Sequence, residues 1–295
     1  MTPWRLDEFF DVFELKQVGP DGFLGESIPE RLRPAEAERA VVDGSQLLGQ
    51  SIVAARRTQP ERVVKSIHMI FSRPALAPAP VEFRIETSHA GRSFASLVVT
   101  AEQAGRLCAR GIVLLDNDES DCVQHAPPIP QAGDPATGVE YDALVTGREV
   151  RIVAGGDYAD PAASGPPSLD VWVRYASSPD DPAIRQAVLA QFCGRHIIGT
   201  AMRPHAGYGE SLAHRTLSTG VLSLTVRFHE DHALDGWLLY SHDALHAGRG
   251  LCDGKGRIFH RDGRLLASFE QEGVIKPLSE QALAEAAKRG RQNVM

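Results

Sequence analysis

The stretch SPDDPAIRQAVLAQFCGRHIIGTAMRP, residues 178–204, decides the fold class. Asp181 can cap a helix whose first position is Pro182, and Pro204 marks the point where that helix must stop. Apolar residues fill most of the helix circumference between these points: Ile184, Ala187, Val188, Leu189, Phe192, Ile197, Ile198 and Met202. A helix that is apolar nearly all round is a buried helix. It needs a sheet around it, so we expect strands on both sides of it in the sequence.

The segments that flank this helix have the composition of strands. In the first half, Asp43-Gly44-Ser45 precedes a second helix over QLLGQSIVAARR, and four strand-like segments follow between Val63 and Leu115. Gly and Pro residues separate these segments, as antiparallel hairpins require. Residues 6–25 are expected to form two short strands joined by a turn. In the second half, strands are expected over 149–152, 169–175, 218–228, 236–248, 249–263 and 264–275.

The two halves of the chain repeat one pattern. The segment His89-Ala90-Gly91-Arg92 matches His246-Ala247-Gly248-Arg249 at a separation of 157 residues, and Phe71 matches Phe228 at the same separation. Gly105-Arg106-Leu107 matches Gly263-Arg264-Leu265 at 158. A drift of one residue over this span indicates a duplicated unit. We therefore predict an α+β protein in which each half has one long helix wrapped by an antiparallel sheet.

Composition along the chain indicates two domains, a linker and a C-terminal tail. Residues 1–120 are expected to form the first domain and residues 141–276 the second. The segment between them, 121–140, is rich in Pro and Gly, has no hydrophobic period and is predicted to be a linker. Residues 277–295 are predicted to form a helical tail on the surface.

Charge and cysteine spacing narrow the class of protein. The net charge is -7 and the sequence pI is about 5.9, which argues against nucleic-acid partners and against an anionic membrane surface. The four cysteines are far apart in the sequence and are expected to be free thiols in a reducing compartment. The first residues lack the pattern of a signal peptide, and the apolar runs are too short to span a bilayer. A cytoplasmic protein without membrane insertion is the expectation.

Several longer segments resemble the type II acyl-CoA thioesterases. The first half carries DGSQLLGQSIVAA at 43–55 and SIHMIFSRPALAPAPVEFRIETSHAGRSFASLVV at 66–99. The second half carries DVWVRYASSPDDP at 170–182, MRPHAG at 202–207, GWLLYS at 236–241 and DGRLLASFEQEGV at 262–274. The resemblance implies a tandem, or double, hot-dog fold and an acyl-CoA or acyl-thioester substrate. It implies no cofactor, and chains of this kind often pair into a homo-oligomer.

The resemblance also implies a reaction, in which water attacks the thioester carbonyl without a covalent nucleophile. The family places an Asp on the second-half helix, a Thr or Ser on the next strand and a Gln near the end of the last strand. Gln271 matches the Gln. The Asp position falls on Gly194 and the hydroxyl position on Val221, so this chain lacks the general base and the hydroxyl at those two positions.

Polar residues close to these two positions are candidates for the missing roles. His196 lies two residues after Gly194, roughly 200° round a continuous helix, and would face elsewhere unless the register slips. Gln191 is closer in angle but cannot act as a base. Thr219 and Ser223 flank the hydroxyl position. For each of them the alternative is an ordinary polar residue at the end of a helix or strand.

Three residues are candidates for binding the substrate that the resemblance implies, and a fourth is related to them by the repeat. Arg249, with Gly250 beside it, is a candidate for contact with the phosphates of CoA, as is its repeat partner Arg92. Gly194 is a candidate for contact with the substrate, because the family carboxylate is replaced there by a residue without a side chain.

Two other motifs are weaker. The segment FHEDHALD, 228–235, contains possible metal ligands, but its spacing is not H-E-x-x-H, so a solvated polar loop is expected and no metal site. The sequence contains no G-x-S-x-G, which argues against the nucleophile elbow of a serine hydrolase.

Three functions stay open on the sequence. The first is hydrolysis of acyl-CoA thioesters at a water site that departs from the family pattern. The second is binding of acyl thioesters without hydrolysis. The third is a different reaction on an acyl thioester, carried out on the same fold.

Overall fold

A long antiparallel sheet is the main feature of the computed structural model, which describes residues 3–27, 41–117, 119, 121–141, 144–153 and 158–279. The first half contributes β2 Lys16–Gln17, β3 Gly22–Gly25, β4 Val63–Phe71, β5 Val81–Ala90, β6 Phe94–Gln103 and β7 Arg106–Asp116. The second half contributes β8 Val139–Glu140, β10 Arg148–Val153, β11 Ser168–Tyr175, β12 Leu217–Phe228, β13 Trp237–Gly248, β14 Leu251–His260 and β15 Leu265–Pro277. Two further strands, β1 Trp4–Arg5 and β9 Val145–Thr146, pair in parallel outside this sheet.

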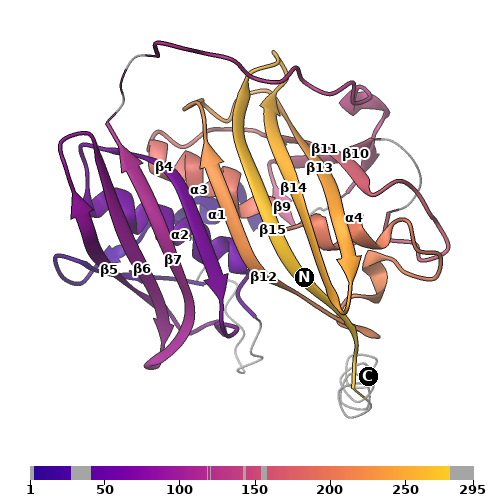
Figure 1. The fold of residues 1–295 in the computed structure, drawn as a ribbon, viewed down its shortest axis with the longest axis horizontal. Helices are drawn as coiled ribbons and strands as arrows, with labels where there is room; N and C mark the ends of the chain where they lie inside the picture. The colour runs from indigo at the N-terminus through magenta and orange to yellow at the C-terminus, as the bar shows by residue number, and fades with distance from the viewer. Residues whose placement is uncertain are drawn as a thin grey trace.

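The strand order of the sheet shows the duplication. Outward from the centre it runs β4-β7-β6-β5-β3 on one side and β12-β15-β14-β13-β11 on the other (Figure 1). In the central pair, His68 of β4 lies opposite Thr225 of β12, 157 residues later, and their side chains hydrogen-bond at 2.7 Å. The register is symmetric about this pair, since Ser66 lies opposite Arg227 and Ile70 opposite Ser223. A pseudo-twofold axis therefore passes through the His68–Thr225 pair.

Register shifts in the sheet repeat at the same separation. The shift between Val64 and Ser66 in β4 recurs between Val221 and Ser223 in β12. The shift between Thr87 and His89 in β5 recurs between Ala244 and His246 in β13. Bulges fix register and redirect side chains, so their repetition is evidence of two copies of one structural unit. The predicted α+β double hot-dog fold is confirmed.

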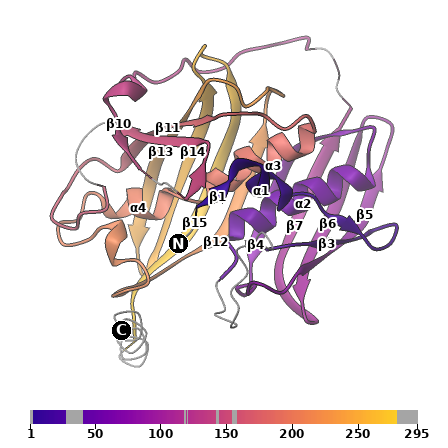
Figure 2. The ribbon, with the colours of Figure 1, turned by 180° about the vertical axis from the view of Figure 1, so that it is seen from behind.

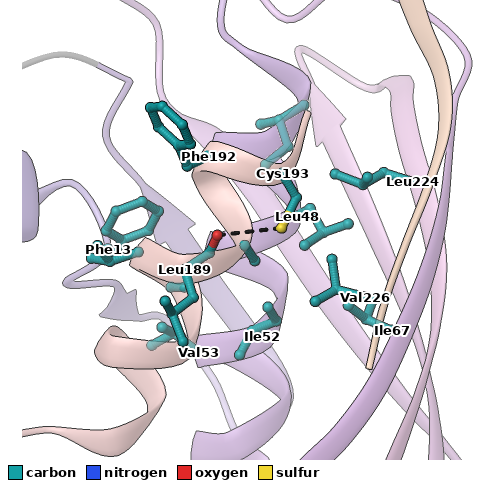
Figure 3. Close-up of a cluster of buried hydrophobic side chains, with 14 of the residues drawn as sticks. Phe13, Leu48, Ile52, Val53, Ile67, Leu189, Phe192, Cys193, Leu224 and Val226 are labelled. Atoms are coloured by element: carbon teal, nitrogen blue, oxygen red, sulfur yellow. Dashed lines mark hydrogen bonds between the residues drawn. The ribbon is translucent and has the colours of Figure 1, made fainter. Parts of the chain in front are cut away.

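Helices cover one face of the sheet (Figure 2). They are α1 Leu6–Asp11, α2 Gly44–Thr58, α3 Pro182–Cys193 and α4 Ile197–Met202, with 3₁₀ turns at Pro135–Thr137 and Glu210–Leu212. Side chains of α2 and α3 meet side chains of β4 and β12 between helix and sheet, as Leu48, Leu189, Ile67 and Val226 show (Figure 3). Buried residues of both halves form one continuous cluster, so the halves share a core.

Gly49 allows α2 and α3 to approach closely. A β-carbon at position 49 would lie 2.6 Å from Phe13 Cε1 and 3.0 Å from the Ala187 carbonyl oxygen. Gly49→Val is therefore expected to lower the free energy of unfolding by about 1–3 kcal/mol through overpacking. Denaturant unfolding of this variant checks it. Gly19→Val is the control, because no atom lies within 4 Å of a β-carbon there; equal stability of the two variants would contradict the expectation.

Two predicted elements were wrong in detail. Residues 6–11 form helix α1 instead of a strand, because Leu6, Phe9, Phe10 and Phe13 share one helical face and Glu8 accepts the Arg5 backbone N–H at 2.9 Å. The predicted strands and turn do follow, as β2 and β3.

The second-half helix is the other correction, because it is two helices. Asp181 caps α3 as predicted, through Ala183 N at 2.8 Å, but the helix ends at Cys193 and α4 begins at Ile197. Glycine has a low helix propensity, and Gly194 stands at the break. The second helix ends at Met202, just before Pro204, which is the stop that the sequence predicted.

The segments outside the two repeats are described in part. Residues 121–140 run along the second half, where Trp172 Nε1 donates to the Gly133 carbonyl at 2.8 Å and Arg261 pairs with Asp134 at 3.0 Å. Strand β15 continues to Pro277, and the helix expected over 277–295 lies outside the described residues from 280 onward. The four cysteines are free, as expected. None of the helices that the structure describes is long and apolar enough to cross a membrane.

Candidate functional site

Gln271 lies on the helix-covered face of the sheet and is 1% exposed. It pairs with Leu224 of β12 on one side and with Gly254 of β14 on the other. Both side-chain atoms, Oε1 and Nε2, are buried and have no hydrogen-bond partner among the described residues. Buried amide groups normally have partners, so Gln271 is an amide in need of a donor and an acceptor.

The break between α3 and α4 lies over Gln271. A β-carbon at Gly194 would lie 3.7 Å from Leu224 Cδ2, and one at Gly254 would lie 2.9 Å from Ile197 Cγ2. Leu224 and Gly254 are the two lateral neighbours of Gln271, so the residues of the break sit above it. Leu224 points from the sheet toward the end of α3 near Cys193 (Figure 3). The structure thus brings Gln271 and Gly194 into one region.

His196 is enclosed within the second half. The ring is fully buried, with Nδ1 3.4 Å from the Tyr158 hydroxyl and its centroid 5.4 Å from that of His242. Burial, together with the charges of His242, Arg195 and Arg148, holds the pKa of His196 well below its usual value. Its Nε2 atom has no partner in the described part of the chain. At neutral pH this imidazole is uncharged.

Thr219 and Ser223 lie on opposite faces of β12. Ser223 follows the bulge and donates to Glu272 Oε2 at 2.6 Å, on the face away from Gln271, because successive strand residues point in opposite directions. Thr219 pairs with Ile275, two residues beyond the Val221–Gly273 pair, and is half-buried. The structure therefore separates Ser223 from Gln271 and leaves Thr219 farther along the strand.

Arg249 and Gly250 form the two-residue turn between β13 and β14. Both have positive φ, 54° and 81°, as a hairpin turn of this length requires. The Arg249 side chain is exposed, and a β-carbon at Gly250 would meet Lys276 Cε at 2.7 Å. The turn thus places two cationic side chains at one end of β15.

Two residues of the first half reach the same region. Ser45, in the first turn of α2, has its Oγ 3.0 Å from where a Gly194 β-carbon would lie. Its hydroxyl donates to Asp43 Oδ1 at 2.7 Å, and Gln191 Nε2 of α3 donates to Asp43 Oδ2 at 3.3 Å. In the sequence, Asp43 and Ser45 stand at the predicted start of a helix, within a segment that resembles the family, and neither is predicted to be a site residue. Their position beside Gly194 depends on packing between the halves, which no local pattern carries.

Buried polar atoms without partners gather around the break. Among the described residues they include Gln191 Oε1, His196 Nε2, His242 Nε2 and both amide atoms of Gln271. Such atoms are normally satisfied by a water or a ligand. Chemically, the region offers an amide to hold a carbonyl or a water, with the carboxylate of Asp43 at its edge.

A separate cluster in the second half has metal-ligand residue types. His232, Asp235 and His260 offer ligand atoms that all lie within 4.8 Å of one another. The sequence predicted a solvated loop here and did not foresee that His260 joins it. Arg264 Nη2 lies 3.2 Å from His232 Nε2, so a guanidinium already occupies that nitrogen and would repel a cation. We assign no metal to this cluster.

Family models match both halves of the chain. The model described as "Acyl-CoA thioesterase C-terminal domain" matches residues 120–275, and "Acyl-CoA thioesterase N-terminal domain" matches residues 33–115. Acyl-CoA thioesterase 2 of Haemophilus influenzae is 25% identical over 292 residues, which cover 92% of this chain and 98% of that protein. Acyl-coenzyme A thioesterase 8 of Mus musculus is 26% identical over 262 residues, 79% of each chain.

Solved structures agree with the fold. The acyl-CoA thioesterase II TesB2 of Mycobacterium marinum superposes with a TM-score of 0.74 and 26% identity, covering 92% of this chain and 99% of that one. A protein with a hot dog fold from Alicyclobacillus acidocaldarius gives a TM-score of 0.69 at 20% identity, over 92% and 99% of the two chains. The second likeness bears on the fold alone.

Proposed function

Because the chain belongs to the acyl-CoA thioesterase family, we propose that it hydrolyses fatty acyl-CoA thioesters to free acid and CoA by direct attack of water. As a thioesterase II-like hydrolase it acts on an acyl-CoA substrate. The observation that supports the proposal is the buried amide of Gln271. The family amide is present, buried, and without partners among the described residues, so it is free to bind reactants.

Gln271 can serve the reaction with both of its amide atoms. Nε2 can donate to an oxygen that gains negative charge, and Oε1 can accept from a water. Holding the water and the carbonyl together removes the entropic cost of bringing them into line. Gly194 and Val221 supply neither a carboxylate nor a hydroxyl, so the water site proposed here differs from the family pattern.

The CoA end of the substrate is proposed to lie at the Arg249–Gly250 turn. Gln271 and Lys276 are five residues apart on β15, which corresponds to roughly 17 Å of strand. CoA carries its phosphates far from its thioester, so a cationic end of the strand suits them. Gly194 is proposed to contact the thioester through its backbone, because Ser45 fills the space where a side chain would lie.

Arg249→Ala tests the placement of CoA. It is expected to raise KM for an acyl-CoA about 10-fold with little change in kcat, because the lost contact is the same in the ground and transition states. The same acyl group on N-acetylcysteamine, which lacks the phosphates, is the control and should show no effect of the substitution. An equal KM change on both substrates would place Arg249 elsewhere.

Release of thiol from a panel of acyl-CoAs tests hydrolysis itself. The assay follows free CoA with a chromogenic disulfide, using a Cys122→Ser background because Cys122 is an exposed free thiol. Time-dependent release with at least one chain length is expected. Absence of release with every chain length, alongside calorimetric binding of a CoA ester, would instead support an acyl-thioester binding protein, one of the two alternatives that Gly194 and Val221 favour.

Mass spectrometry of the same reactions separates the third function. Conversion of the acyl group with the thioester intact would indicate a different reaction on this fold. Assembly into a homo-oligomer also stays a prediction, and light scattering coupled to size-exclusion chromatography checks it.

A further inference from the structure

We infer that Asp43, which caps α2 in the first half, supplies the general-base carboxylate that position 194 lacks. The inference rests on the proposed hydrolysis and deepens it by naming the group that takes the proton from water.

The space around position 194 belongs to the start of α2. A β-carbon on Gly194 would lie 3.0 Å from Ser45 Oγ and 3.1 Å from Ser45 Cβ. Ser45 is 1% exposed, so its side chain is fixed in this position. Its hydroxyl donates to Asp43 Oδ1 at 2.7 Å. A carboxylate is therefore present one hydrogen bond away from the residue that contacts position 194, and it comes from the other half of the molecule.

The Asp43 carboxylate is oriented by both helices. Oδ1 accepts from Ser45 N at 2.9 Å and from Ser45 Oγ, and Oδ2 accepts from Gln191 Nε2 at 3.3 Å. The Asp43 side chain is exposed, so water can reach it. Gln191 is only 9% exposed, and its Oε1 atom has no partner among the described residues. That acceptor needs a donor beside the carboxylate, which a bound water would be.

Helix capping alone does not require this arrangement. Asp181 caps α3 in the corresponding way, accepting from Ala183 N at 2.8 Å. Ala183 stands where α2 has Ser45, so α3 has no hydroxyl at this position. Asp181 is therefore a matched cap without the features that face position 194.

The reaction balances with Asp43 as the base. The water oxygen forms a bond to the thioester carbonyl carbon while its proton passes to Asp43. The carbonyl oxygen becomes an oxyanion, to which Gln271 Nε2 donates. Collapse of the tetrahedral intermediate breaks the C–S bond, and the departing CoA thiolate takes the proton from Asp43. The products are the free acid and CoA, and the carboxylate is regenerated.

Asp43→Ser is the test, with Asp181→Ser as its control. Serine also caps helices, so both variants keep a capping group. Asparagine is avoided because an Asn–Gly pair at 43–44 deamidates back to a carboxylate. Loss of a general base is expected to lower kcat about 10²–10⁴-fold with little change in KM. Asp181→Ser should keep the wild-type kcat. A second variant, Asp43→Ser with Gly194→Asp, returns a carboxylate to the family position.

Position 194 can accept this change. Gly194 has φ -76° and ψ -2°, which any residue adopts. A new β-carbon would lie 3.0 Å from Ser45 Oγ and 3.1 Å from Ser45 Cβ, so the Ser45 side chain must shift slightly, and Asp43→Ser removes the hydrogen bond to Oδ1 that holds it. The double variant is expected to recover at least 10-fold in kcat over Asp43→Ser alone, which a purely structural role of Asp43 would not produce.

Three results would overturn the inference. Wild-type kcat in Asp43→Ser, or an equal loss in Asp181→Ser, would remove Asp43 as the base while leaving hydrolysis intact. Release of CoA by the single variant Gly194→Asp but not by the wild type would reject both the inference and the proposed function. Circular dichroism of each variant establishes that the fold is retained.

Discussion

Replacing Gln271 by alanine is expected to lower kcat by about 10²–10³-fold, the usual effect of removing one donor to a developing oxyanion. The side chain is buried beneath the break between α3 and α4, and its amide atoms have no partners among the residues that the structure describes. Its removal therefore breaks no hydrogen bond that holds the fold in the described structure. Because the donor acts on charge that appears in the transition state, KM should change little. Steady-state thiol release measures both constants.

Glu272→Ala is the matched control for this substitution. Glu272 is the next residue on the same strand, points to the opposite face and accepts a hydrogen bond from Ser223. Its loss removes a contact of the strand without touching the helix-covered side, so kcat should stay close to that of the wild type, and the free energy of unfolding should change by no more than about 0.5 kcal/mol, as is usual for surface positions. Equal rates for wild type and Gln271→Ala would take Gln271 out of the mechanism.

Acid should destabilise the second half through its buried histidines. Burial lowers the pKa of His242 from 6.5 to about 4, and the pKa of the neighbouring His196 is also well below its usual value. Between pH 4 and pH 6.5, most unfolded chains carry a proton on His242 and most folded chains do not. The stabilisation is therefore complete above pH 6.5 and falls as pH drops toward 4, by about 3 kcal/mol in total for His242.

His242→Asn isolates this contribution. His242 Nδ1 donates to the Leu169 carbonyl at 3.0 Å, and an asparagine amide can make the same bond without titrating. Urea unfolding at several pH values is expected to give a wild-type slope steeper by about 1.4 kcal/mol per pH unit than that of the variant in the middle of this window. If the free energy of unfolding changes with pH equally in the two proteins, burial does not lower the pKa of His242.

The sequence predicted the fold through features that repeat. Strand boundaries and the symmetry between halves follow from local pattern and from the spacing of 157 residues, so the long strands β4 to β7 and β10 to β15 were located in advance. The break at Gly194 was missed, because apolar residues continue on both sides of it. The residue after the break, Ile197, lies close to Gly254 of β14, which is distant in the sequence. Helix periodicity carries no information about such contacts.

Of the candidate site, only the part in the second half of the chain was predictable from the sequence. Gln271 belongs to a motif within a single strand and was located from the sequence alone. Asp43 and Ser45 precede Gln271 by more than two hundred residues and reach the site by the packing of α2 against α3. A search for a substitute near Gly194 in the sequence finds His196, whose ring is enclosed by Tyr158 and His242. Proximity in the chain and proximity in space differ here because Ser45 and Asp43 of one copy of the repeat pack beside Gly194 and Gln191 of the other.

The seam between β4 and β12, where His68 meets Thr225, has a consequence for how the protein responds to dilution. Two separate chains that built a site across such a seam would lose it as their concentration fell below the dissociation constant. Here the two sides of the seam belong to one polypeptide, and the tether holds them at a high effective concentration. Turnover per chain should therefore stay constant as the protein is diluted, and each copy of the repeat is free to specialise without losing its partner.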